Sequence, residues 1–273
     1  MPEELPVYEV VAKNYGADHP NKIHSDEGAA KYGFAGALVP GVGLYAYLTR
    51  PVVDALGLEW VEHGAMKSRF IHPVYDGERL LVRSWVVNAD PVELRLELHN
   101  HSCIICALGS ASLATSALPP DPENYPVRQL PPADQLRPAT LSAFYTDKLL
   151  GSLDFTFAST DEGFLDDVLE RLPIYRGGEA VCHPALWVSK ANEIIMQNVA
   201  LGPWIHTASE VQYYTLARPG ERFSVRGRVI ESYTKRDNEY IVIDIGVFGD
   251  DERPVALIKH TAIIKIGVAR KNE

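Results

Sequence analysis

The chain has 273 residues and a mass of 30.2 kDa, a size that predicts one large or two medium-sized domains. Hydrophobic residues make up 46% and charged residues 23%, which excludes a disordered or fibrous chain. The formal net charge of −10 argues against a nucleic-acid partner, because phosphate binding needs a basic surface. Two stretches lack charged residues, 34–49 and 98–120, and neither is a run of about 20 apolar residues that would span a membrane.

The first four residues, Met1 to Glu4, are acidic and open no apolar run, so we expect no signal peptide. Three cysteines, an odd number in a chain of this length, predict a reducing compartment and no disulfide framework. We therefore expect a soluble, cytoplasmic protein with no membrane partner.

The two halves of the chain match each other at a spacing of 143 residues, without a gap over about 30 positions. A repeat this long predicts two copies of one domain rather than a solenoid of short units. The matching pairs include Leu58 with Leu201, His63 with His206, Gly77 with Gly220 and Arg79 with Arg222.

Each copy shows the same order of predicted elements, an apolar helix followed by four strands. The helices, 42–55 and 185–199, carry no charged stripe wide enough for a surface helix, so we expect them to be buried. Turn signals separate the strands, which predicts an antiparallel meander on each helix and an α+β fold. The predicted strands are 63–74, 79–89, 92–101 and 103–115 in the first copy, and 206–217, 222–234, 239–249 and 254–267 in the second.

A connector rich in proline separates the copies. Seven prolines lie within 116–139, a density that no helix or central strand tolerates. We therefore divide the chain into an N-terminal domain at 1–118, a linker at 119–139 and a C-terminal domain at 140–273.

A cluster of polar and glycine residues precedes the first buried helix. Asn21, His24 and Asp26 are followed by Gly33-Phe34 and then by an apolar segment that ends at Gly41. Over 18–48 this pattern resembles the MaoC-like hotdog family of acyl-thioester hydratases and dehydratases. The family's motif reads Asp-x-Asn-Pro-x-His-x-Asp, then Gly-Phe, and closes with an apolar-apolar-His-Gly segment at the central helix. The resemblance implies a double hotdog, two tandem units that each wrap an antiparallel sheet around a long helix.

The resemblance also implies roles for individual residues. His24 would be the catalytic base, the backbone N–H of Gly41 would bind the thioester oxygen, and Asn21, Val39 and Pro40 would line the substrate site. The family's catalytic aspartate lies five residues before the histidine, where this chain has His19. Asp18, one residue earlier, takes that role if the loop shifts; otherwise His19 replaces the aspartate or the pair is incomplete.

The chemistry of hydration explains why such residues suit the site. Adding water to a 2-enoyl thioester requires a base at the β-carbon, a proton donor at the α-carbon and stabilisation of negative charge on the thioester oxygen. Histidine titrates near neutral pH, and the start of a helix offers unpaired N–H groups. Glycine at position 41 would let a ligand approach the backbone closely.

Structural roles compete with these catalytic ones. Asp26 stands where a short helix over 27–32 would begin, so we predict that it is the N-cap of that helix. The side chain of Asn21 suits hydrogen bonds that hold the loop, and Gly41 suits a turn after Pro40. The structural role of Asn21 is compatible with a place in the active site, whereas a turn role for Gly41 is an alternative to binding the thioester oxygen.

Other patterns in the sequence do not indicate a cofactor or metal site. The Gly-x-Gly-x-x-Ala run at 41–46 lacks the alternating strands and helices of a dinucleotide-binding fold. His99, His101, Cys103 and Cys106 are predicted to be buried strand residues, because neighbouring strand positions point to opposite faces. Cys182 is predicted to pack in the core. We expect no metal and no redox cofactor.

The second copy lacks the motif. Asp167 stands opposite His24, in an acidic run at 161–167 that we expect to open a helix, and His183-Pro184 stands opposite Pro40-Gly41. The resemblance implies that such a half completes the sheet and shapes the acyl tunnel. Trp187 would either close that tunnel or pack in the core.

The leading hypothesis is a hydratase or dehydratase of acyl thioesters, with coenzyme A or a carrier-protein arm as part of the substrate. A thioesterase, or a non-catalytic acyl-binding or assembly subunit, is the alternative. Asp18 and His24 facing one water near Gly41 would favour an enzyme, whereas Asp18 facing solvent would favour binding alone. A homodimer formed through the sheets is also expected.

Overall fold

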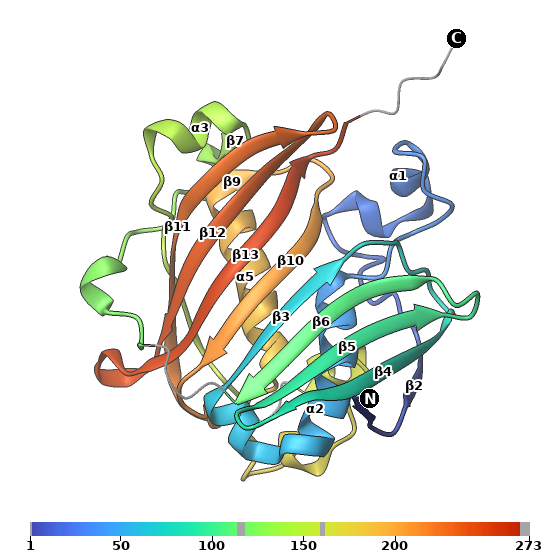
Figure 1. The fold of residues 1–273 in the computed structure, drawn as a ribbon. Coiled ribbons are helices and arrows are strands. Elements are labelled where there is room, and N and C mark those ends of the chain that lie inside the picture. The colour runs from blue at the N-terminus through green and yellow to red at the C-terminus, as the bar shows by residue number, and fades with distance from the viewer. Residues whose placement is uncertain (1, 114–117, 159–161, 268–273) are drawn as a thin grey trace.

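In the computed structural model, which describes residues 2–113, 118–158 and 162–267, the strands of both halves form one curved sheet (Figure 1). The two long helices α2 (Gly41–His63) and α5 (Pro184–Asn198) lie together on the same side of this sheet. The strands are β1 (Glu3–Glu4), β2 (Tyr8–Val11), β3 (Gly64–Phe70), β4 (Arg79–Ala89), β5 (Val92–Asn100), β6 (Ile105–Leu113), β8 (Leu153–Thr156), β10 (Ile205–Tyr213), β11 (Arg222–Lys235), β12 (Asn238–Phe248) and β13 (Pro254–Lys265).

The sheet order shows the internal repeat. It runs β1-β4-β5-β6-β3-β10-β13-β12-β11-β8, with β2 paired to β4, and the halves join where β3 meets β10. In each half the last three strands form a meander, but the first strand pairs with the fourth instead of the second, so the prediction of a simple four-strand meander is wrong. This junction is antiparallel, with Ser68 opposite Ser209. The α+β architecture predicted from the sequence, one sheet around one helix in each half, is therefore confirmed.

The central helices begin where the sequence predicts them and bury most of their surface. Pro40 is the N-cap of α2 and Pro184 is the first residue of α5, a position where proline loses no intrahelical hydrogen bond. Helix α2 continues past the predicted end at 55, but Gly57 has a φ of 62° and interrupts it. Its mostly buried stretch from Val42 to Val53 packs against the strands of the first half.

The connector between the halves contains short elements that the proline count alone did not predict. They are the turns η2 (Pro122–Asn124) and η3 (Ala133–Gln135), and the strand β7 (Arg137–Pro138), which pairs with β9 (Val199–Ala200). Tyr125 anchors the connector to the second half, because its hydroxyl donates to Asp244 over 2.9 Å. Helices α3 (Leu141–Thr146) and α4 (Glu162–Asp167) follow, and α4 falls within the acidic run predicted to open a helix.

The cysteine and histidine cluster near residue 100 differs from its prediction. His101 and Cys103 lie exposed in the turn between β5 and β6, where Cys103 has a φ of 60°. The hairpin reverses at these residues, so they do not continue the strand. Cys106 is buried in β6, as expected, and Cys182 is buried as well.

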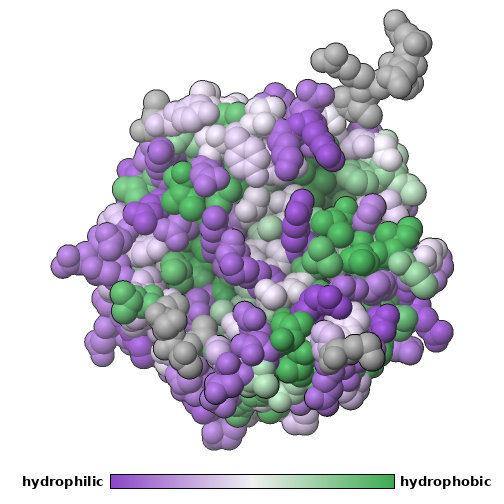
Figure 2. All heavy atoms as spheres, in the orientation of Figure 1, coloured by the Kyte–Doolittle hydropathy of each residue, from purple (hydrophilic) through white to green (hydrophobic). Residues whose placement is uncertain are grey.

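Figure 2 shows the outward face of the sheet as a mixture of hydrophilic and hydrophobic side chains. Val87, Ile104 and Leu108 are among the exposed hydrophobic residues of the first half. Such residues are compatible with pairing of two chains through their sheets, and the homodimer stays a prediction.

Candidate active site

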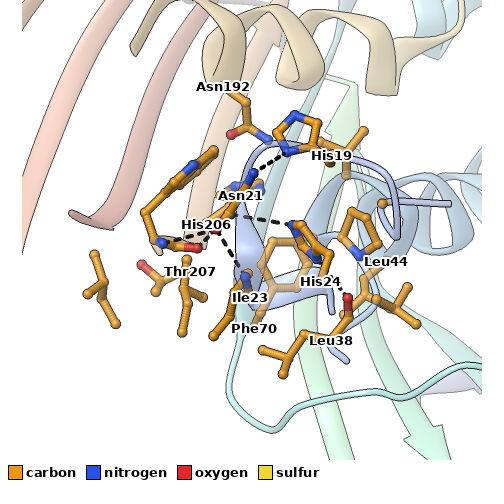
Figure 3. Close-up of a pocket in the computed structure, with 18 of the residues that line it drawn as sticks. His19, Asn21, Ile23, His24, Leu38, Leu44, Phe70, Asn192, His206 and Thr207 are labelled. Carbon is orange, nitrogen blue, oxygen red and sulfur yellow. Dashed lines mark hydrogen bonds between the residues drawn. The ribbon is translucent and has the colours of Figure 1, made fainter. Parts of the chain in front are cut away.

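A cavity of about 570 Å³ opens between the two halves, at the start of α2 (Figure 3). Its walls come from the polar loop before α2, the end of β3 with the residues after it, the start of β10, and one face of α5. The predicted site residues that line it are Asn21, His24, Val39, Pro40 and Gly41, and His19 lines it too.

Asn21 fastens the polar loop to the second half. Its amide Nδ2 donates to the backbone oxygen of Trp204 over 2.9 Å, and its Oδ1 accepts from the backbone N–H groups of Trp204 (3.2 Å) and Ile23 (3.3 Å). Only 6% of Asn21 is exposed. These contacts give Asn21 the structural role predicted for it, at the edge of the cavity.

His24 follows Asn21 as the last residue of the turn η1 (Lys22–His24) and lines the cavity. Its Nδ1 lies 2.7 Å from the backbone oxygen of Leu38, which can only accept, so Nδ1 carries the hydrogen. Nε2 then keeps its lone pair and lies 3.5 Å from the amide nitrogen of Asn21. Burial lowers the pKa of His24 to about 4, and His19 acts in the same direction, whereas the Leu38 bond opposes them. His24 is therefore a neutral base at physiological pH.

The residues before His24 show which side chain lies where the family's motif has its aspartate. Asp18 is exposed and does not line the cavity, so the structure does not bring it to His24. His19 lies at the cavity instead, with its ring 6.0 Å from that of His24 in an edge-to-face arrangement. Its Nδ1 accepts from the backbone N–H of Asn21 over 3.1 Å, which leaves the hydrogen on Nε2. Burial and the charge of Lys22 lower the pKa of His19.

The short helix α1 (Asp26–Ala30) braces this loop, and its cap differs from the prediction. Ser25 is the N-cap, since its Oγ accepts from the backbone N–H of Gly28 over 3.2 Å. Asp26 lies one residue later, where its Oδ1 accepts from the N–H of Ala37 over 2.8 Å. The helix starts one residue earlier than predicted, so the serine takes the capping position and Asp26 ties the helix to the following loop.

Gly41 begins α2 beside His206. A Cβ atom on Gly41 would lie 2.9 Å from His206 Nδ1 and 3.2 Å from the Phe70 ring, so no larger residue fits without displacing them. The N–H groups in the first turn of a helix have no intrahelical partner, and the positive end of the helix dipole lies there. The start of α2 is thus suited to bind a negatively charged oxygen.

His206, from β10, belongs to a buried polar row behind Gly41 that the sequence did not reveal. Its Nε2 lies 2.8 Å from Ser209 Oγ, which lies 3.1 Å from Nδ1 of His260. The rings of His206 and His260 stack at 4.2 Å. Burial and the neighbouring His260 lower the pKa of His206 well below its ordinary value, so the row is uncharged.

One face of α5 completes the cavity with residues from the second half. Trp187 is not among them: it packs on Phe155 and Phe223 in the core, with ring centroids 6.1 and 5.2 Å away. Of the two roles considered for Trp187, the structure shows the core role. The α5 residues that line the cavity are Ser189, Asn192, Glu193, Met196 and Gln197.

The corresponding position in the second half is filled by its own side chains. His183, the N-cap of α5, is buried with Nε2 3.6 Å from a carboxylate oxygen of Glu170. The Tyr175 ring packs against His183 at 4.5 Å. Asp167, opposite His24 in the repeat, pairs instead with Lys13 over 3.0 Å at the surface. The second half therefore retains the helix start without a histidine base facing an open cavity.

No group of three or more His, Cys, Asp or Glu side chains in the described part of the chain is arranged to hold a metal ion. No helix within the described ranges is both long and apolar enough to cross a membrane.

Residues 2–99 match the family model described as "MaoC like domain". The N-terminal part of the chain is therefore similar to a MaoC-like domain. The match covers the loop, the whole of α2, strands β3 and β4 and nearly all of β5, and so includes every residue of the predicted site. No curated protein sequence matches the chain.

Solved structures extend the likeness over both halves. A MaoC domain protein of Chloroflexus aurantiacus J-10-fl, a candidate dehydratase, is 11% identical with a TM-score of 0.65, and the match covers 98% of this chain and 96% of that one. The Mycobacterium tuberculosis protein RV0216, which has a double hotdog fold, is 14% identical with a TM-score of 0.60 and 96% of both chains covered. A candidate oleoyl thioesterase from Lactobacillus plantarum is 12% identical with a TM-score of 0.54 and 97% of both covered. The chain therefore has the double hotdog fold, as predicted.

Proposed function

We propose that this MaoC-like protein adds water to a 2-enoyl thioester or removes it from a 3-hydroxyacyl thioester. The observation that carries the proposal is the neutral His24, which lines the cavity that begins at Gly41, with its Nδ1 held by Leu38 and its lone pair on Nε2 beside the Asn21 amide. A base and a helix start in one cavity are the two features that this reaction needs.

His24 can perform both proton transfers. In hydration, its Nε2 takes a proton from water as the water oxygen bonds to the β-carbon, and the double-bond electrons move onto the thioester oxygen. The imidazolium then returns the same proton to the α-carbon, and the thioester carbonyl re-forms. A pKa of about 4 makes the protonated His24 a stronger acid than an ordinary imidazolium, which favours this second step. Dehydration runs the same steps in reverse.

His19 takes the place of the family's aspartate in this mechanism. Its Nε2–H would donate to the oxygen of the attacking water, because its Nδ1 is already occupied by the Asn21 N–H. A donor orients the water without removing its proton, which leaves His24 as the sole base. The N–H groups at Gly41 would stabilise the oxygen that gains negative charge.

Thioester hydrolysis is the second candidate. The same water and the same helix start would serve an attack at the carbonyl carbon, and a hotdog protein described as an oleoyl thioesterase shares the fold. The exposed Asp18 favours a third candidate, an acyl-binding subunit, only if His19 cannot replace the aspartate.

One experiment separates the three. The purified protein is incubated with trans-2-enoyl-CoA thioesters of several chain lengths, while the conjugated enoyl absorbance and the release of free thiol are followed together. We expect loss of the absorbance without thiol release, and a rate at least about 100-fold lower in His24→Gln. Thiol release would instead establish a thioesterase, and binding without either change would establish an acyl-binding subunit.

The proposed substrate brings its own thioester carrier, coenzyme A or a carrier-protein arm, and the proposed mechanism uses no metal and no redox cofactor. The odd number of cysteines, three in the chain, is compatible with the proposed cytoplasmic location.

A further inference from the structure

The face of α5 that lines the cavity is polar. Ser189, Asn192, Glu193, Met196 and Gln197 follow the spacing i, i+3, i+4, i+7, i+8 of one helical face, and Met196 is the only apolar residue among them. The rest of the helix is packed into the core through Val188, Ala191, Ile194 and Ile195, among others. A cavity built for a hydrocarbon chain would carry apolar side chains on this face as well.

The charged residues near this face limit the class of ligand that the cavity can hold. No lysine or arginine is among the described residues that line the cavity. Glu193 contributes the one carboxylate on the α5 wall, and Lys190 holds it over 2.7 Å. An anionic ligand group would be repelled by the Glu193 carboxylate and would have no lysine or arginine in the lining to pair with. An uncharged hydrogen-bonding group could instead contact Ser189, Asn192 and Gln197.

Asn192 is the residue on this face best placed to contact a ligand. Its Oδ1 is buried and has no hydrogen-bond partner among the described residues. By contrast, the side-chain amide of Asn198, in the same helix, has partners for both its oxygen and its nitrogen. It donates to the backbone oxygens of Gly151 and Ile194 and accepts from the N–H of Gly151. A buried amide oxygen without a partner is costly, and rotation of the amide lets Asn192 present either its oxygen or its NH₂ to a ligand.

The position of Asn192 indicates which part of the substrate it would contact. Figure 3 shows its side chain reaching from α5 toward His19, the neighbour of His24. In the proposed reaction His19 orients the water that attacks the β-carbon, while the N–H groups at Gly41 bind the thioester oxygen. Asn192 therefore lies on the side of the β-carbon and of the acyl atoms beyond it, rather than on the side of the sulfur.

We propose, resting on the proposed function, that the natural acyl group is uncharged and polar beyond the β-carbon, carrying a hydroxyl or amide group that hydrogen-bonds Asn192. The α5 wall supplied by the second half selects this group against a plain alkyl chain of the same length. The second half thus determines acyl specificity, although it carries no base of its own.

Calorimetric titration with non-reacting ligands tests this inference apart from catalysis. Saturated alkyl-CoA thioesters of increasing length are compared with their ω-hydroxy and ω-carboxy counterparts, in the wild type and in Asn192→Leu. We expect one ω-hydroxy ligand to bind about tenfold more tightly than its alkyl counterpart, and this preference to disappear in Asn192→Leu. The ω-carboxy ligands should bind more weakly than both.

Two results would overturn the inference. One is equal affinity of alkyl and hydroxy ligands at every length. The other is a uniform loss for all CoA thioesters in Asn192→Leu, which would show that the wall holds the pantetheine arm. Folding is checked by thermal unfolding, in which Asn192→Leu should keep the wild-type midpoint and Asn198→Leu should lower it. A hydroxyl preference without enoyl hydration would contradict the proposed function alone.

Discussion

His24 donates a hydrogen bond from Nδ1 to the backbone oxygen of Leu38 over 2.7 Å. This bond fixes the ring orientation and the tautomer, because the carbonyl oxygen can only accept. Leu38 itself is held by the loop, since its N–H donates to the backbone oxygen of Ile23 over 3.2 Å. The loop that carries the base thus also sets which ring nitrogen keeps its lone pair.

The replacement of the aspartate by His19 gives the first prediction. Asp18→Asn should leave the rate of enoyl-CoA hydration unchanged, because Asp18 is exposed outside the cavity. His19→Ala should lower kcat by about 100-fold, since the donor to water is lost. Steady-state kinetics of both variants check this. The reverse pattern, a large loss in Asp18→Asn with His19→Ala unaffected, would mean that Asp18 reaches the substrate.

The second prediction concerns the crowded start of α2. Gly41→Ala places a Cβ 2.9 Å from His206 Nδ1, so either the helix start or the imidazole must move. We expect hydration to fall by at least about tenfold, because small displacements of an oxyanion site are costly. Gly202→Ala is the matched control, since a Cβ there meets nothing within 4 Å. Equal activity of the two variants would remove Gly41 from the site.

Asn21 provides a prediction about stability. Asn21→Ala leaves both backbone groups of Trp204 without their partner, in a place where little water enters. The free energy of unfolding should fall by about 1–3 kcal/mol, as measured by urea denaturation. Asn88→Ala serves as the control, because Asn88 is exposed. A loss no greater than that of the control would show that the loop is held to the second half by other contacts.

Glu170 should make the stability of the folded protein depend on pH in the acidic range. Burial acts to raise its pKa, but the contacts with His183 and with the N–H groups of Leu172 and Arg171 outweigh it, so the pKa lies below its ordinary 4.5. A carboxyl with a lowered pKa stabilises the folded state above its ordinary pKa, and this stability is lost as the pH falls through the lowered value. Glu170→Gln should therefore be less stable than the wild type at pH 7. Denaturation at several pH values should show the gap closing below pH 4.5, and a gap independent of pH would contradict this account.

Local patterns were enough to predict most of the fold. The turn at Arg218-Pro219-Gly220 places the start of β11 at Arg222, as predicted, and the repeat placed the central helices. The capping of α1 by Ser25 instead of Asp26 shows the limit of such patterns, because both residues can cap and the choice depends on one residue of register.

The cavity was predictable only on the side where the residues are close in sequence. The motif identified the loop with His24, Asn21 and Gly41, but not His206 or Asn192, which reach the cavity through the pairing of β3 with β10 and through the packing of α5. A signal for Asn192 was present, namely polar residues at positions 189, 192, 193 and 197, which share one face of a helix with many apolar residues on its other faces. Periodicity alone does not say that such a face meets a cavity rather than solvent.

The pH dependence of kcat/KM for enoyl-CoA hydration tests the central claim most directly. The account predicts a rate that is constant from about pH 5 to neutrality and falls at lower pH with an apparent pKa of about 4, as His24 becomes protonated. His24→Gln should lose the activity across this whole range. An acid limb with a pKa near that of an ordinary histidine, or a His24→Gln variant that keeps the wild-type rate and profile, would contradict the assignment of the buried, neutral His24 as the base.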